Sequence, residues 1–183
     1  SASSLLSLIN DILDSSKIES GKMEIIPVEY EISSLINDIY NMISVKARNK
    51  DLELIVDVDK GIPCKYFGDD LRIRQVLINL LTNAVKYTEK GTITVSVSGR
   101  RNGDNEILRF SVKDTGSGIK DEDIDKLFAK FERIEEKKNR NIEGTGLGMS
   151  ITTQLLELMN SGLEVESEYG VGSEFYFFLE QKI

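Results

Sequence analysis

The 183-residue chain contains no histidine and a single cysteine, Cys64. A disulfide framework is therefore excluded, because it needs pairs of cysteines, and zinc sites of the usual Cys/His type lack their ligands. The sequence also lacks a run of about 18 apolar residues, which a membrane-spanning helix would need, and a signal-peptide pattern. We therefore expect a soluble, cytoplasmic segment that does not itself insert into a membrane.

Positive charge is in deficit, with 23 Lys and Arg against 31 Asp and Glu and a net charge of −8. This balance opposes a large interface with nucleic acid or with an anionic membrane, so any basic residues must act locally. The length suits one sizeable core plus an appendage, and no internal repeat is evident. We expect one globular domain.

The most informative stretch is residues 68–89, which predicts a helix with two distinct faces. Its apolar residues recur at three- and four-residue steps, which is typical of a helix in a core. A second, polar stripe follows the same helix and contains Gln75, Asn79, Asn83, Lys86 and, beside it, Tyr87. Asparagine competes with the helix backbone for hydrogen bonds, so this stripe favours a bound ligand over a merely solvated face. Amide oxygens beside a cation suit hydrated Mg2+ and its phosphates.

Hydrophobic periodicity predicts the remaining elements. Helices are expected over residues 4–19, 32–49 and 144–160, the last with Ile151, Leu155, Leu158 and Met159 inward. Strands are expected over residues 23–31, 52–59, 92–101, 107–114, 162–168 and 173–180, whereas residues 63–68 should form only a short crossing. The pattern predicts an α+β, two-layer sandwich: one mixed sheet covered by three helices on one face, with a long lid and an additional N-terminal helix.

The N-terminal helix carries a broad apolar stripe, formed by Leu5, Leu6, Ile9, Ile12 and Leu13. A short helix with so wide a stripe needs a partner. It can be a terminal helix docked on its own domain or half of a helical hairpin. We favour the hairpin, because the charged segment 17–22 separates this stripe from the next element.

Two glycine-rich segments enclose about thirty residues that have little regular pattern and therefore suggest a functional lid. Asp114 shares a strand face with apolar residues, so its carboxylate needs donors; it either caps its own turn or accepts from an exocyclic amine such as that of adenine. Residues 144–148 open a helix, whose N–H groups can hold phosphate. The lid also carries the basic residues Arg133, Lys137, Lys138 and Arg140.

Over its whole length the sequence resembles part of a bacterial sensor histidine kinase, especially of hybrid type: the catalytic, ATP-binding domain preceded by one hairpin helix. Residues 79–86 (NLLTNAVK) resemble the family's asparagine box, residues 114–119 (DTGSGI) its first glycine box, residues 128–131 (FAKF) its paired-phenylalanine box and residues 144–148 (GTGLG) its second glycine box. Residues 1–22 resemble the second helix of the dimerisation and phosphoacceptor hairpin. The resemblance thus implies a partial hairpin over residues 1–22 and the catalytic domain over residues 23–183.

The resemblance also implies roles for individual residues. At the phosphate end, Asn83 would ligate Mg2+, Asn79 would support the metal and phosphates, and Lys86 and Arg133 would reach the phosphates. At the base end, Asp114 would read the adenine amine, Tyr87 would pack near the nucleoside, and Ser173 would assist through water. The nucleotide would further be lined by Gly116, Gly118, Ile119, Thr145, Gly146, Leu147 and Gly148.

The partners follow from the same resemblance. The phosphoacceptor histidine would lie on the other hairpin helix, outside this histidine-free sequence. The parent would form a homodimer through the hairpin and would pass phosphate to a response-regulator receiver domain. The resemblance also allows the parent to be anchored in the inner membrane. Where many relatives have a further glycine, this lid has residues 139–143 (NRNIE), which leaves lid closure open.

Three other functions compete with phosphoryl transfer to histidine. An ATP-driven clamp, as in gyrase, mismatch-repair ATPases or heat-shock chaperones, would need a glutamate four residues before the metal asparagine to activate water, and Asn79 has no basic site. A serine kinase acting as an anti-sigma factor fits poorly with the hairpin-like helix. A nucleotide-binding module without catalysis stays open.

Overall fold

The computed structural model describes the backbone of residues 2–124 and 147–183. Its helices are α1 (Ala2–Glu19), α2 (Ile32–Asn49), α3 (Asp70–Tyr87) and α6 (Leu147–Leu158), and residues 121–124 are also helical. Its strands are β1 (Val28–Glu31), β2 (Glu53–Val58), β3 (Lys65–Gly68), β4 (Thr92–Asn102), β5 (Asn105–Asp114), β6 (Glu164–Glu168) and β7 (Gly172–Lys182).

The strands form a single mixed sheet in the order β1-β3-β7-β5-β4-β2, with β6 paired to β7 beside this path. β2 and β4 run parallel, and every other pair is antiparallel. The parallel pair is possible because the chain between β2 and β4 crosses over through α3. β4 and β5 form the expected hairpin through Gly103 and Asp104.

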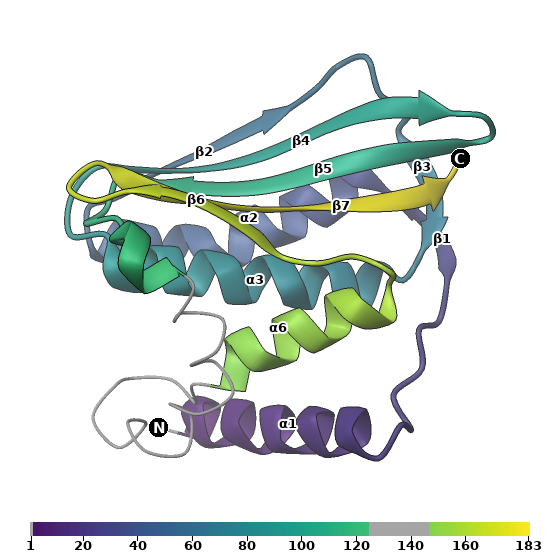
Figure 1. The fold of residues 1–183 in the computed structure, drawn as a ribbon, viewed down its shortest axis with the longest axis horizontal. Coiled ribbons are helices and arrows are strands. Elements are labelled where there is room, and N and C mark those ends of the chain that lie inside the picture. Colours follow the sequence, from purple (N-terminus) through teal and green to yellow (C-terminus); the bar gives the residue numbers. More distant parts are fainter. Residues whose placement is uncertain (1, 125–146) are drawn as a thin grey trace.

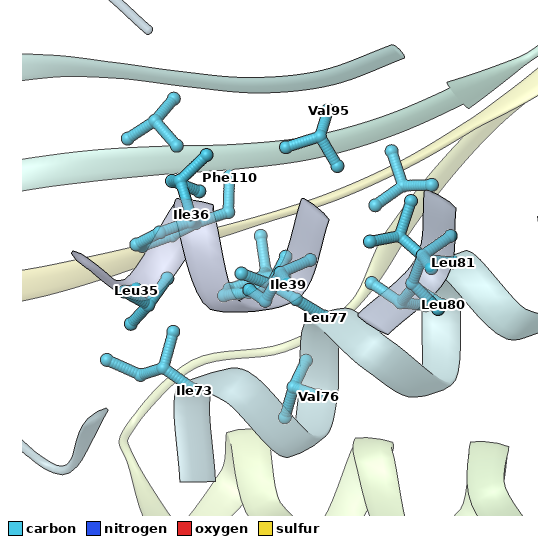
Figure 2. Close-up of a cluster of buried hydrophobic side chains, with 14 of the residues drawn as sticks. Leu35, Ile36, Ile39, Ile73, Val76, Leu77, Leu80, Leu81, Val95 and Phe110 are labelled. Atoms are coloured by element: carbon cyan, nitrogen blue, oxygen red, sulfur yellow. The ribbon is translucent and has the colours of Figure 1, made fainter. Parts of the chain in front are cut away.

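The core lies between this sheet and the helices α2 and α3 (Figures 1 and 2). Side chains from one stripe of α2, from one stripe of α3 and from the inner face of β4 and β5 interdigitate there, among them Leu35, Ile39, Ile73, Leu77, Leu81, Val95 and Phe110. These are the periodic apolar positions that the sequence predicts. The polar stripe of α3 is therefore turned away from the sheet.

The helices lie in successive layers on one side of the sheet. α6 lies beyond α3 on the same side of the sheet, and α1 lies beyond α6 at the outer edge of the molecule (Figure 1). The α+β sandwich with a mixed sheet and helices on one face is thus confirmed, with α1 as the additional N-terminal helix. Among the residues described, no helix combines the length and the apolar content that crossing a bilayer would require.

Three local expectations were wrong. The strand expected from residue 23 begins only at Val28, because Pro27 lacks an N–H and the N–H of Ile26 donates to the Asp69 carboxylate at 2.8 Å. Residues 65–68 are the strand β3 rather than only a crossing, since β1 pairs with them. In α6, Leu158 is 42% exposed and Leu156 is fully buried in its place.

Candidate functional site

The candidate site lies at one end of the sheet, where three distant segments meet. The end of α3, the end of β5 and the turn between β6 and β7 lie at the same end of the molecule (Figure 1). Asp114 pairs with Ile93 on β4 and with Ser173 on β7, which brings two of the expected site residues together.

Asp114 is a buried acid in an apolar setting. It points to the helix-covered face of β5, with Leu108, Phe110 and Val112, and is 8% exposed. Its Oδ1 accepts a hydrogen bond from the N–H of Gly116 at 2.9 Å. Burial raises the pKa of Asp114, while the N–H groups of Gly116 and Ser173 oppose this shift. The sequence left open whether Asp114 caps its own turn, and the Gly116 bond shows that it does.

The loop after β5 is locked to the turn between β6 and β7. Ile119 N–H donates to Ser167 Oγ at 2.6 Å, Gly170 N–H donates to Ser117 O at 2.7 Å, and Ser167 Oγ lies 2.8 Å from Ser173 Oγ. These contacts hold the backbone beside Asp114 in place in the absence of a ligand.

Two glycines permit this close approach. Gly118 has φ +70°, and a Cβ on it would lie 2.1 Å from the carbonyl oxygen of Glu168. Gly172 has φ +153°, and its Cβ would lie 2.1 Å from the carbonyl oxygen of Asp114. The neighbouring backbone therefore requires a glycine at 118 even without a ligand, and the expected place of Gly118 beside a nucleotide stays a prediction.

The polar stripe of α3 divides into residues with different surroundings. Asn79 Nδ2 donates to the Gly148 carbonyl oxygen at 3.1 Å and to Thr152 Oγ1 at 3.2 Å, both in the first turns of α6. Asn83 is half-buried, and its side chain has no hydrogen-bond partner in the described parts of the chain. Lys86 Nζ lies 5.4 Å from the ring centroid of Tyr87, which is 58% exposed.

Some expected site residues lie outside the described residues. These are Arg133, Thr145, Gly146 and the side chain of Leu147, together with residues 128–131 and most of the expected lid. Gly148 is described, and it lies beside Asn79 at the start of α6. The structure therefore describes the residues expected around the base and, at the expected phosphate end, shows Asn79 beside Gly148.

Sequence reasoning missed three residues at this site. Thr152 is fully buried, and its Oγ1 donates to the Gly148 carbonyl oxygen at 2.7 Å as well as accepting from Asn79. Ser167 links the two loops described above. Thr88 is fully buried beside Gly116, and its hydroxyl has no partner in the described parts of the chain. Thr152 follows Gly148 by four residues, the spacing at which a threonine hydroxyl in a helix can reach a backbone carbonyl.

A family profile described as "Histidine kinase-, DNA gyrase B-, and HSP90-like ATPase" matches residues 68–183. The chain is 41% identical over 94% of its length to hybrid signal transduction histidine kinase B of Dictyostelium discoideum. It is 39% identical over 98% of its length to the sensor histidine kinase GacS of Pseudomonas protegens.

Among solved structures, full-length ShkA in complex with AMPPNP has a TM-score of 0.81 and 30% identity, covering 98% of this chain and 36% of that one. The sequence spans only 9% of the length of the Dictyostelium kinase and 20% of that of GacS. It corresponds to the ATPase-type nucleotide domain found within sensor histidine kinases. The chain belongs to the histidine kinase-, DNA gyrase B- and HSP90-like ATPase family.

Proposed function

We propose that this segment binds ATP with Mg2+ and transfers the γ-phosphoryl group to a histidine outside residues 1–183, as the catalytic domain of a two-component sensor histidine kinase. Residues 23–183 would form that domain, and residues 1–22 would belong to the hairpin that carries the histidine. The family membership and the kinase relatives support the proposal.

The observation that carries the proposal is the buried carboxylate of Asp114. Keeping an acid at 8% exposure on an apolar face is unfavourable unless donors compensate it. Its raised pKa indicates that Gly116 and Ser173 compensate it only in part. An adenine amine would supply the missing donor, with Ser173 assisting through water and Tyr87 packing against the nucleoside.

At the phosphate end, Asn83 and Lys86 have the chemistry that Mg2+ and phosphate need. Asn83 offers an amide oxygen that no described residue engages. Within residues 2–124 and 147–183, no three Asp, Glu, His or Cys side chains gather as a metal cluster. A magnesium ion would thus take most of its ligands from phosphates and water around Asn83. Lys86, Arg133 and the N–H groups of residues 145–148 would bind the phosphates.

Transfer is favoured over hydrolysis by the state of Asn79. Its amide donates to α6 and has no basic site, so it cannot activate water. A histidine imidazole would instead attack the γ-phosphorus in line, forming an N–P bond while the bond to the β-phosphate oxygen breaks and ADP leaves. This chain's part is positioning and charge neutralisation.

The partners are proposed from the exposed surface of α1. Leu5, Leu6, Ile9, Ile12 and Leu13 are 45–60% exposed, so this apolar stripe is free to pack in a helical hairpin. A hairpin of this kind would carry the acceptor histidine and dimerise the parent. A receiver domain would then take the phosphoryl group, in keeping with the hybrid kinases among the relatives.

The test is transfer in trans. The segment is incubated with labelled ATP and Mg2+, with and without a folded hairpin that bears the parent's histidine, and acid-labile phosphoprotein and free phosphate are both followed. We expect labelling only with the hairpin and slow phosphate release throughout. The variant Asn83→Ala should abolish labelling, whereas Asn37→Ala, on the exposed side of α2, should not. Brisk phosphate release by the segment alone would instead indicate an ATP-driven clamp.

A further inference from the structure

Among the α1 residues whose side chains the structure describes, those on the side of the rest of the molecule are mostly polar. While its apolar stripe is exposed, the residues Asp11, Asp14, Ser15 and Ile18 on the opposite side are half-buried. Only Ile18 among these packs against the hydrophobic core. Because only one of these four side chains is apolar, we expect polar contacts among the described residues to define where α1 sits.

Asp14 makes these contacts in a closed network with two residues of α3. Gln75 Nε2 donates to Asp14 Oδ2 at 2.8 Å, and Arg72 Nη1 lies 3.7 Å from Asp14 Oδ1. Arg72 Nη1 also donates to Gln75 Oε1 at 2.8 Å. The Asp14 and Arg72 side chains are 18% and 17% exposed, so water screens this pair only in part. Removing Asp14 would leave both partners short of an acceptor.

One stripe of α3 thus has three successive surroundings. Gln75 bonds to α1, Asn79 one turn later bonds to α6, and Asn83 another turn later faces the proposed metal position. α6 lies between α1 and α3, and it contacts both (Figure 1). The first turn of α6 holds Gly148, beside the proposed phosphate position.

We propose that Asp14 is a positioning residue that couples the docking of α1 to nucleotide binding through α6. Docked α1 confines α6 against α3, and the confined α6 presents its first turn to the phosphates. The coupling is reciprocal, so bound nucleotide must strengthen the docking of α1 by the same factor. This inference rests on the proposed function, since it requires that the site bind ATP.

The test uses the whole segment and a non-hydrolysable ATP analogue with Mg2+. Calorimetry measures the affinity, and hydrogen exchange measures the protection of α1 and α6. In the unaltered protein, the analogue should slow exchange in both helices. Asp14→Ala should abolish the slowing in α1 and weaken analogue binding by about fivefold, the lower end of the range usual for coupled sites.

A rescue experiment separates positioning from general damage. Gln75→Glu alone places two carboxylates together and should weaken binding as Asp14→Ala does. Combining it with Asp14→Asn exchanges the amide and the carboxylate, so Arg72 keeps its ion pair and affinity should return. The matched control is Asp38→Ala, which removes the 3.0 Å ion pair of Arg74 between α2 and α3 and should leave affinity unchanged.

Each result decides between the two proposals. Analogue binding that is equal in the unaltered protein, Asp14→Ala and Gln75→Glu would overturn the coupling and leave the proposed function standing. Failure of the unaltered protein to bind the analogue would overturn both. If Asp14→Ala does not fold, as judged by circular dichroism, the other variants provide the test. Affinity should then fall in Gln75→Glu and recover when Asp14→Asn is added, and no such change would overturn the coupling.

Discussion

Asp114 lowers the stability of the folded protein at neutral pH. Because burial raises its pKa, the folded chain holds the proton more tightly than the unfolded chain does. The contribution of Asp114 to the free energy of unfolding is therefore fully present below the pKa of an unfolded aspartate. It is lost as the pH rises through the raised pKa of the folded state. An uncharged side chain of the same shape would avoid this loss.

We accordingly predict that Asp114→Asn stabilises the ligand-free protein and damages ATP binding. The asparagine oxygen can still accept from Gly116 N–H, but the charge that an adenine amine would meet is gone. A gain of about 1 kcal/mol would raise Tm by about 2–4 °C. ATP affinity should fall by about tenfold or more, as for loss of a charge-assisted bond of at least about 1.5 kcal/mol. A thermal scan at pH 7 and calorimetry measure the two effects.

The control is Asp104→Asn in the exposed β4–β5 turn, which should change neither quantity. Equal affinity of the unaltered protein for ATP and GTP would remove the proposed role of Asp114. Where adenine has its amine, guanine has a carbonyl, which offers the Asp114 carboxylate no donor.

Gly118 provides a steric prediction at the same scale. Gly118→Ala should destabilise the protein by about 1–3 kcal/mol, since alanine is strained at φ +70° and its Cβ would collide with the Glu168 carbonyl. Two controls separate these causes in urea unfolding. Gly170→Ala shares a positive φ but has open space, and Gly162→Ala has open space without a positive φ. If Gly118→Ala costs no more than Gly170→Ala, the contact with Glu168 is unimportant.

At the scale of elements, the decisive joint is that between α3 and α6. Asn79 and Thr152 form it around the Gly148 carbonyl, which lies in the first turn of α6. Because this turn borders the proposed phosphate position, the joint sets how α6 meets a nucleotide.

Thr152→Val tests this joint, because it keeps the buried shape and removes the hydroxyl. We expect a loss of about 1–3 kcal/mol in the free energy of unfolding, as for a buried partner left unsatisfied. Hydrogen exchange in α6 should also become faster. Thr153→Val is the matched control, since among the described residues its hydroxyl bonds to Ser150 O within the same helix and not to α3. Equal losses for the two variants would contradict a special role for the joint.

At the scale of the whole molecule, the prediction concerns the expected lid. Its length and sparse apolar content predict that this segment, expected over residues 116–143, gains order when nucleotide binds, beyond the hydrogen bonds that already hold Ser117 and Ile119. Hydrogen exchange across this segment should slow when a non-hydrolysable ATP analogue and Mg2+ are added. The exposed hairpin turn at residues 102–104 provides the internal reference. Unchanged exchange would mean that Arg133 and the neighbouring lysines do not contact phosphate.

The sequence by itself determined the sandwich, the main helices and the grouping of Asn79, Asn83 and Lys86 on one stripe. These features depend on local periodicity, which a single helix or strand already displays. The same reasoning missed β3 and placed Leu158 inward, because short strands and the exact rotation of a helix depend on what packs against them.

Only the tertiary structure decided what each residue of the stripe contacts. Asn79 meets Gly148 across 69 positions of sequence, and Gln75 meets Asp14 across 61. Likewise, position 118 requires a glycine because the Glu168 carbonyl lies close to it, and no local sequence pattern predicts that contact. The physical reason is that hydrogen-bond partners and close approaches are settled by how helices and strands stack, whereas periodicity records only which side of an element faces the core.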